Sequence, residues 1–303
     1  MRKTFSNTIA ELATADESIL FLTGDLGYNA LEGLREKLGD RFINMGVAEQ
    51  NMVGAAAGMA YKGYKVFCYS IAPFIVYRCL EQFRNDVCFH NLPVFLVGNG
   101  GGYGYGIMGS SHHALEDIAC LSGMQNNGTW VPAFNDDIKP LLIEILKESK
   151  PAYFRLGLGK ESPAKQSRYG SFNSVLESKK SKGTIIALGP VIHNVLDAIS
   201  AAGLNDTFNL LSCVTLPLKM DNYVYDKIKE SENLLIVEEH IAHGGIGQQI
   251  AASILKDKIQ VKNFISLTAK GYPDKQYGSQ AFHQEQSNLD VASIGNVLKQ
   301  FCA

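Results

Sequence analysis

Short runs rich in aliphatic and aromatic residues alternate with longer stretches of helical spacing in the N-terminal part of this chain. Three runs, SILFLTGD, KVFCYSI and LPVFLVGN, are typical of buried strands, and apolar residues recur at helical intervals in segments 48–63 and 73–91 between them. This repetition predicts an α/β protein with mostly parallel sheets. Because ligands bind at the carboxyl ends of strands in such sheets, we expect a site around Asp25, Ser70 and the segment after Val97.

The length and composition indicate two domains. A chain of 303 residues with 46% hydrophobic content can bury more than one large core. The stretch from Pro151 to Gly183 is polar and rich in Lys, Ser and Gly, which is typical of a linker. Beyond it, GTIIALGP, TFNLLSCV, NLLIVEEH and KNFISLTA are strand candidates separated by helical stretches. We therefore predict a domain over residues 1–160, a linker over 161–182 and a second α/β domain over 183–303.

The charge balance and the lack of long apolar runs disfavour a nucleic-acid-binding or membrane protein. With 28 basic and 30 acidic residues the net charge is −2, so no overall field favours binding to nucleic acid or to an anionic membrane. No run approaches the roughly 20 apolar residues of a membrane span, and the first residues are too polar for a signal peptide. We expect a soluble, cytoplasmic protein. Six cysteines without a CxxC pair indicate reduced thiols and favour neither disulfides nor a zinc site.

One acid, Glu49, lies inside the otherwise neutral, small and apolar segment GVAEQNMVGAAAGMA. If this segment is a helix, Glu49 lies in its first turn, where the helix dipole favours a carboxylate. The apolar surroundings suggest partial burial, and a buried carboxylate needs a partner. The alternative interpretation is a solvated charge at a helix N-terminus.

The segment from Asp40 to Val97, which contains GVAEQNMVGAAAGMA and SIAPFIVYRCLEQFRNDVC, resembles the pyrimidine-binding domain of the transketolase family of thiamine diphosphate enzymes. The resemblance implies that Glu49 hydrogen-bonds the aminopyrimidine ring and promotes the tautomer that activates the cofactor. It also implies that Phe74 and Tyr77 pack on this ring and that Asp25, near the pyrimidine and the active-site opening, is a further cofactor-binding residue. On spacing alone, Phe74 and Tyr77 are equally consistent with a pair facing the core.

The resemblance extends over the whole chain, because LIVEEHIAHGGIGQQIA is similar to the C-terminal domain of transketolases. One family motif is absent: members hold the diphosphate through Mg2+ with a GDG motif, and no GDG occurs here. The chain therefore resembles the C-terminal half of a split transketolase. This implies that thiamine diphosphate and Mg2+ are bound together with an N-terminal subunit carrying the GDG motif. The expected assembly is an α2β2 heterotetramer, with no metal ligand from this chain.

Two arginines match phosphate-binding positions of the family. RKTFSNTIAELA places Arg2, and PAYFRLG places Arg155, where transketolases bind a sugar phosphate. Two guanidinium groups on one phosphate would give bidentate charged hydrogen bonds. Asn29 takes the position of a phosphate-binding serine. For Arg2 alone, a frayed basic terminus is the alternative interpretation.

The segment GSSHHALEDIA resembles the family's GPTHQ segment, in which the histidine contacts the donor hydroxyl groups near the reacting carbon. His112 takes that position and His113 replaces the glutamine, and the resemblance implies that both histidines bind substrate. A neutral imidazole donates or accepts a hydrogen bond, which suits a sugar site. A metal site at this pair is disfavoured because no carboxylate lies at ligand spacing.

The loop GNGGGYGYGIMG departs from the family. Gly100 stands in place of a second phosphate-site histidine, and Met108 in place of an aspartate that reads the acceptor. These replacements remove groups that recognise the usual pentose phosphate acceptor. We expect a flexible active-site loop in which Tyr103 and Tyr105 admit a bulkier acceptor. The later GGIG is expected to pack a strand against a helix, with anion binding as the alternative.

These features together predict two-carbon ketol transfer from a ketose or ketose phosphate to an aldose, with Glu49 activating the cofactor and His112 positioning the donor. One alternative is a 2-oxoacid donor, as in 1-deoxyxylulose-phosphate synthase or the β chain of 2-oxoacid dehydrogenases. The other alternative is a noncatalytic subunit that keeps the fold.

Overall fold

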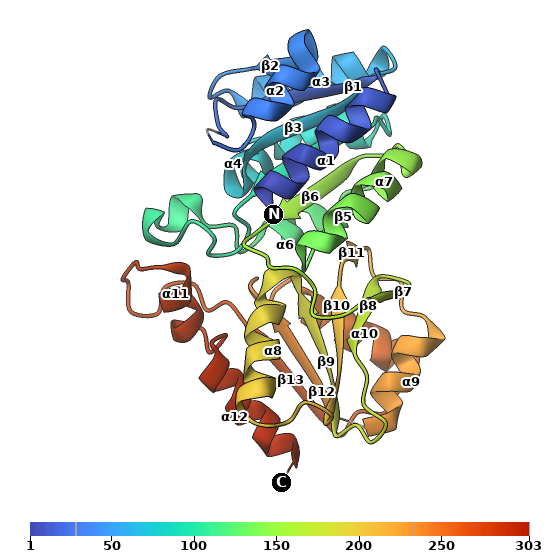
Figure 1. Ribbon diagram of the computed structural model, residues 1–303, viewed down its shortest axis with the longest axis vertical. Coiled ribbons are helices and arrows are strands. Elements are labelled where there is room, and N and C mark those ends of the chain that lie inside the picture. The colour runs from blue at the N-terminus through green and yellow to red at the C-terminus, as the bar shows by residue number, and fades with distance from the viewer. Residues whose placement is uncertain (28, 232, 303) are drawn as a thin grey trace.

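The computed structural model describes residues 1–27, 29–231 and 233–302, which form two α/β domains arranged end to end (Figure 1). The first sheet has seven strands in the order β11-β5-β6-β4-β3-β1-β2, and the second has six in the order β13-β12-β9-β10-β8-β7. Most neighbouring strands are parallel. The predicted fold class, two mostly parallel sheets flanked by helices, is confirmed.

The first sheet is covered by helices on both faces, because its central strands are apolar on both sides. Phe67 and Cys68, neighbours in the third strand, belong to different cores: Phe67 packs with Phe5, and Cys68 packs with Val53. The strands are β1 (Ile19–Thr23), β2 (Phe42–Asn44), β3 (Lys65–Ile71), β4 (Val94–Asn99), β5 (Gly128–Trp130) and β6 (Ala152–Leu156). The helices are α1 (Arg2–Ala15), α2 (Glu32–Leu38), α3 (Glu49–Tyr61), α4 (Ala72–Tyr77), α5 (Leu80–Gln82), α6 (Asp117–Ser122) and α7 (Ile138–Glu148).

The second sheet is built in the same way, and Ile236 and Val237 of one central strand face its two separate cores. The four strands expected beyond residue 183 are all present, as β9, β10, β12 and β13. The strands are β7 (Ser167–Tyr169), β8 (Phe172–Leu176), β9 (Gly183–Leu188), β10 (Phe208–Cys213), β12 (Asn233–Glu238) and β13 (Asn263–Thr268). The helices are α8 (Ile192–Ala201), α9 (Asn222–Ser231), α10 (Ile246–Lys256), α11 (Gln280–Gln286) and α12 (Val291–Cys302).

The segment 161–182, predicted to be a linker, contains a β-hairpin of the second sheet. Strands β7 and β8 pair antiparallel with each other, and β8 pairs antiparallel with β10. Its polar composition misled the prediction because β7 is a short edge strand, and edge strands tolerate polar residues. Residues 161–166 before β7 and residues 177–182 after β8 lie outside the strands.

The two domains share a sheet. The two-residue strand β11 (Thr215–Leu216) follows β10 of the second domain, yet it pairs antiparallel with β5 at the edge of the first sheet. Thr215 lies opposite Trp130, and Leu216 lies opposite Thr129. The second domain therefore completes the first sheet by main-chain hydrogen bonding as well as by side-chain contact.

Within the described ranges, none of the helices combines the length and the apolar character that a membrane crossing requires. The six cysteines are free thiols, four of them buried and two, Cys120 and Cys302, exposed. Burial raises the pKa of the Cys79 thiol to about 12.

Candidate functional site

Polar side chains gather at the carboxyl edge of the first sheet, as the alternation of strands and helices predicts. Ser70 lies near the end of β3, and Asn99 is the last residue of β4. Glu49 begins α3, which follows β2 after a short turn. A Cβ atom placed on Gly24, just after β1, would lie 3.4 Å from both Glu49 Oε1 and Ser70 Oγ. The ends of β1 and β3 and the first turn of α3 therefore meet around one carboxylate.

Glu49 is buried, with 2% of its surface exposed. The Ser70 hydroxyl donates to Glu49 Oε1 at 2.8 Å, and Arg78 Nη1 lies 2.9 Å from Glu49 Oε2. The Arg78 side chain is 45% exposed, so the carboxylate of this ion pair is shielded from solvent while the guanidinium is accessible to it. The alternative of a solvated charge at a helix N-terminus is wrong, because both carboxylate oxygens are paired inside the protein.

Arg78 is a site residue that the sequence interpretation missed. Its guanidinium carbon lies 3.9 Å from the ring centroid of Phe74, which precedes it by four residues. Side chains four residues apart lie on the same side of a helix, so this spacing was the available signal. An exposed cation therefore covers Phe74 and neutralises Glu49 at the same time.

Phe74 and Tyr77 are half-buried at the edge of the sheet. The ring of Phe74 meets that of His112 edge to face, with centroids 5.0 Å apart. The Tyr77 hydroxyl donates to Glu116 Oε2 at 2.9 Å and accepts from the Glu116 amide at 3.1 Å. The structure thus links Glu49 to Phe74 through Arg78, and Phe74 to His112 by ring contact. Glu116, which holds Tyr77, was not among the predicted site residues.

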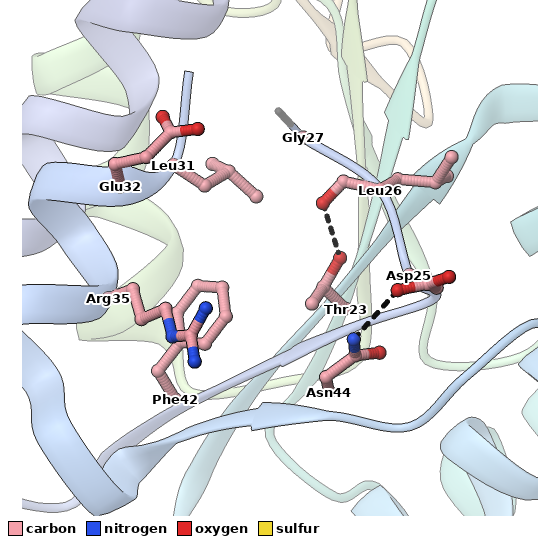
Figure 2. Close-up of a pocket in the computed structure, with 9 residues that line it drawn as sticks. All are labelled: Thr23, Asp25, Leu26, Gly27, Leu31, Glu32, Arg35, Phe42 and Asn44. Carbon is pink, nitrogen blue, oxygen red and sulfur yellow. Dashed lines mark hydrogen bonds between the residues drawn. The ribbon is translucent and has the colours of Figure 1, made fainter. Parts of the chain in front are cut away.

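Asp25 lies beside a cavity of about 180 Å³ at the ends of β1 and β2. Figure 2 shows Asp25 Oδ1 accepting a hydrogen bond from Asn44 Nδ2, at 2.8 Å, while Leu31 and Glu32 line the other side of the cavity. The backbone of Asp25 has a positive φ of 58°, a conformation uncommon outside glycine. The turn after β1 therefore holds this carboxylate at the open edge of the sheet.

A second cavity, of about 400 Å³, joins Arg2 and Asn29, which were both predicted to bind substrate. Asn99 and Tyr105 also line it, and Asn99 Nδ2 donates to the Tyr105 hydroxyl at 2.7 Å. Arg2 is the first residue of α1, so it belongs to an ordered helix, in contrast to the frayed-terminus interpretation.

The structure does not bring Arg155 to this cavity. Arg155 is 4% exposed, and its Nε lies 2.8 Å from Oδ2 of the fully buried Asp117. Its Nη2 donates to the carbonyl oxygens of Ala114 and Glu239, at 2.8 and 3.1 Å. A guanidinium in this apolar setting needs a counter-ion, and Asp117 supplies it from within the chain. The expectation that Arg2 and Arg155 converge on one phosphate is therefore corrected.

His113 is likewise turned away from the open edge. It is 2% exposed, its Nε2 lies 2.7 Å from the Gly106 carbonyl oxygen and its Nδ1 lies 2.9 Å from the Tyr272 hydroxyl. Burial lowers the pKa of this imidazole. His113 therefore supports the loop from inside, and the structure does not place it for the predicted substrate contact.

The glycine-rich loop after β4 has two faces. Tyr103 is fully buried between the domains, so it cannot shape the substrate cavity as predicted, whereas Tyr105 does line that cavity. Gly100 has a positive φ of 74°, and any Cβ atom there would clash with the Tyr105 ring. The tyrosine thus occupies the space next to Gly100. Met108 is 53% exposed at the outer end of the loop.

The amides of the GGIG segment bind a carboxyl group that belongs to the chain itself. Glu238 Oε2 and Oε1 accept from the amides of Ile246 and Gly247 at the start of α10, at 2.8 and 2.9 Å. A side chain on Gly245 or Gly247 would meet this carboxylate. The hydrogen bonds between Glu238 and these amides therefore attach β12 to α10. They account both for the expected packing of a strand against a helix and for the alternative, a carboxylate at a helix N-terminus. No external anion is needed at this site.

Among the described residues, no three His, Cys, Asp or Glu side chains lie close enough together to hold a metal ion. The carboxylates at the edge of the first sheet act singly: Asp25 with Asn44, Glu49 with Arg78, and Glu116 with Tyr77.

Comparison with known proteins gives one family match and several relatives. The family model for the transketolase pyrimidine-binding domain matches residues 1–159. A subunit of the apulose-4-phosphate transketolase of Actinobacillus succinogenes is 30% identical over 84% of this chain and 83% of that protein. The 1-deoxy-D-xylulose-5-phosphate synthase of Clostridium beijerinckii is 29% identical over 98% of this chain, which spans only 48% of that protein.

Solved structures share the fold over nearly the whole chain. A split-gene transketolase, described as an inactive β4 tetramer, aligns with a TM-score of 0.80 at 24% identity over 99% of this chain and 96% of that one. The transketolase of Campylobacter jejuni aligns with a TM-score of 0.78 at 18% identity over 98% of this chain and 46% of its own length. At these identities the likeness describes the fold alone.

Proposed function

Because this chain belongs to the transketolase pyrimidine-binding domain family, we propose that it is one subunit of a two-subunit ketol transferase that uses thiamine diphosphate. The observation that carries the proposal is the buried Glu49 carboxylate, joined through Arg78 to the half-buried ring of Phe74. A carboxylate shielded from water forms a strong hydrogen bond to a ring nitrogen, and an aromatic face packs on a heterocycle. These residues fit the aminopyrimidine half of the cofactor.

The diphosphate half of the cofactor would be held through Mg2+, and the described residues offer no cluster of three His, Cys, Asp or Glu side chains for this ion. Mg2+ requires several oxygen ligands in octahedral arrangement. We therefore place the diphosphate and Mg2+ ligands on a partner subunit that carries a GDG motif. Two relatives that match most of this chain are named as subunits of a transketolase, which supports a two-chain enzyme. An α2β2 assembly remains our expectation for its stoichiometry.

Thiamine diphosphate, when bound, supplies the carbon nucleophile and electron sink needed to cleave and form a carbon–carbon bond next to a carbonyl. In this chain, Glu49 would hold the proton shared with the pyrimidine ring, and Ser70 and Arg78 would fix the carboxylate. His112, packed on Phe74, would position the hydroxyl groups of the donor. Tyr77 and Glu116 would form the adjoining wall.

We assign the substrate end to the cavity of Arg2, Asn29, Asn99 and Tyr105. Arg2 carries the charge that would bind a sugar phosphate, and two relatives are named for a sugar phosphate. Arg155 takes no part in this assignment because it is buried and its Nε and Nη2 donate to groups within the protein. Tyr105 would offer a neutral hydroxyl to the substrate.

The test is reconstitution with a GDG-containing partner, thiamine diphosphate and Mg2+. We expect ketol transfer from a ketose phosphate to an aldose by the assembled pair and none by this chain alone. Full activity of the isolated chain would contradict the split arrangement.

A 2-oxoacid donor is the second candidate, favoured by the identity to 1-deoxy-D-xylulose-5-phosphate synthases over nearly the whole chain. Release of CO2 from pyruvate by the same reconstituted pair, without ketol transfer, would establish it in place of the first. A noncatalytic role would gain if substitution of Glu49 left the assembled complex fully active.

A further inference from the structure

The loop of residues 100–113, which carries His112, is held by the second domain. Figure 1 shows α11 of the second domain beside this loop, which projects from the end of β4. Gly106 lies within the loop, and a Cβ atom there would be 3.0 Å from the Gln280 amide nitrogen at the start of α11. The Tyr277 hydroxyl donates to Ser110 Oγ at 3.3 Å. The loop is thus contacted by a segment that is far from it in sequence.

A single carboxylate joins these elements. Glu239 follows β12 and is 5% exposed. Its Oε1 accepts from the Tyr103 amide at 2.6 Å and from Gln280 Nε2 at 2.9 Å, and its Oε2 accepts from Gln284 Nε2 at 2.6 Å. One donor thus comes from the loop and two come from α11. Charge-assisted hydrogen bonds of this kind are the stronger ones in proteins.

The sequence of the loop is adapted to this approach. A side chain at Gly102 would clash with the Glu239 carboxylate, and Gly102 has a positive φ of 66°. The next residue, Tyr103, donates from its hydroxyl to the Gly271 carbonyl at 2.9 Å and stacks on His283 at a centroid distance of 4.9 Å. Glycine therefore permits the contact, and the tyrosine anchors it in the second domain.

The anchored part of the loop is connected to His112 by short steps. The Tyr103 ring meets His113 edge to face at 5.3 Å, and His113 is held between the Gly106 carbonyl and the Tyr272 hydroxyl. His112 precedes it directly, and the His112 amide donates to the Gly109 carbonyl at 3.0 Å. The Glu239 contact is therefore linked to the imidazole that meets the Phe74 ring through Tyr103, His113 and the loop backbone.

We propose that Glu239 is a positioning residue: its carboxylate fixes the loop of residues 100–113 from the second domain and so sets the place of His112. The substrate role of His112 rests on the proposed function, whereas the restraint on the loop rests on the contacts of Glu239 alone. The second domain would thereby control substrate binding on the first domain without touching the substrate.

The test compares Glu239→Gln with Glu238→Gln in the assembled enzyme. Glu238 is the adjacent residue and is similarly buried, but its carboxylate accepts from amides at the start of α10, whereas Glu239 accepts from the loop. Glutamine keeps the shape of the side chain but replaces one acceptor oxygen by a donor, which opposes the donors around Glu239. We expect hydrogen exchange at the loop amides, Tyr103 included, to accelerate about tenfold in Glu239→Gln alone.

The second readout is steady-state kinetics. Glu239→Gln should raise KM for the ketose donor about threefold or more, whereas Glu238→Gln, acting only on stability, should change the active fraction and leave KM unchanged. If Glu239→Gln does not fold, Gln280→Met removes donors to the same carboxylate at a half-buried position and should give a smaller effect in the same direction.

Equal loop exchange in the Glu239 and Glu238 variants would overturn the proposal, as would faster exchange with unchanged KM. The exchange measurement does not require activity. An unsubstituted assembly that lacks ketol transfer would therefore refute the proposed function separately, while faster loop exchange would still identify the Glu239 restraint.

Discussion

Both sheets carry buried glutamates near the carboxyl ends of their parallel strands, but the two edges are finished differently. At the first sheet, Glu49 is paired with the exposed arginine Arg78, and cavities adjoin the strand ends. At the second sheet, Glu238 binds the amides of α10, and Glu239 binds Tyr103 and α11. At the second sheet the chain's own hydrogen-bond donors pair with both glutamates, whereas cavities remain beside the strand ends of the first sheet. We therefore expect the ligand site at the first sheet.

The difference shows that one architecture can serve recognition in one domain and support in the other. Burial raises the pKa of Glu239, yet each of its oxygens is satisfied from within the chain. Glu49 obtains its cation from a side chain that solvent can reach. The following predictions test whether the open edge carries the chemistry and whether the closed edge carries the stability.

The largest effect is expected at the open edge. Glu49→Gln should lower the thiamine-dependent rate of the reconstituted enzyme by about 10²- to 10⁴-fold, because the proton shared with the pyrimidine ring is lost. The measurement is kcat at saturating cofactor. Glu238→Gln is the matched control and should retain most of the rate, and an equal loss in both variants would contradict the division between the edges.

The buried ion pair of Arg155 and Asp117 lies in the first domain and should dominate stability. Arg155→Met leaves Asp117 fully buried without its cation and should lower the free energy of unfolding by about 3–5 kcal/mol. Lys139→Met removes an exposed pair with Glu11 of similar N–O distance, 2.7 Å, and should cost about 0–1 kcal/mol. Urea unfolding measures both, and similar values would show that burial of the pair is not decisive.

Glu238, at the edge of the second sheet, should make the free energy of unfolding depend on pH. Burial raises the pKa of Glu238 from 4.5 to about 7, although the two amides of α10 act in the opposite direction. The folded state therefore keeps a proton that the unfolded state releases, so the free energy of unfolding should fall by about 3 kcal/mol as pH rises from 4.5 to 7. Glu238→Gln should flatten this dependence in unfolding curves, while Glu11→Gln, an exposed control, should leave it unchanged.

The smallest effect is expected in the substrate cavity. Tyr105→Phe removes the hydroxyl that accepts from Asn99 and should raise KM for a ketose phosphate by about 2- to 10-fold, because one neutral hydrogen bond contributes about 0.5–1.5 kcal/mol. Tyr64→Phe, at an exposed site, is the control. An unchanged KM would move the substrate away from Tyr105.

The fold and the central carboxylate could be predicted because their signals are local. Apolar runs define β1, β3 and β4, and one acid in a neutral helix indicates the buried Glu49. The roles of Arg155 and Tyr103 could not be predicted in this way. Arg155 depends on Asp117, 38 residues earlier, and Tyr103 depends on Glu239, 136 residues later. The resemblance of the segment PAYFRLG to a family segment predicted the position of Arg155 in the fold, but it gave no information about the residues that surround this side chain.

The linker prediction failed for a related reason. The segment 161–182 is polar, as a connection between domains would be, but its strand β8 forms main-chain hydrogen bonds with β10. Local composition indicates exposure of side chains, and it carries no information about which distant strand satisfies the main chain.

The strand β11 has a practical consequence for anyone who divides this protein into parts. A fragment that ends at residue 160 would lose the pairing of β11 with β5 and present the bare backbone of β5 to other molecules. Unpaired sheet edges recruit other chains and promote aggregation. A boundary chosen between the two sheets would therefore yield a poorly behaved N-terminal fragment.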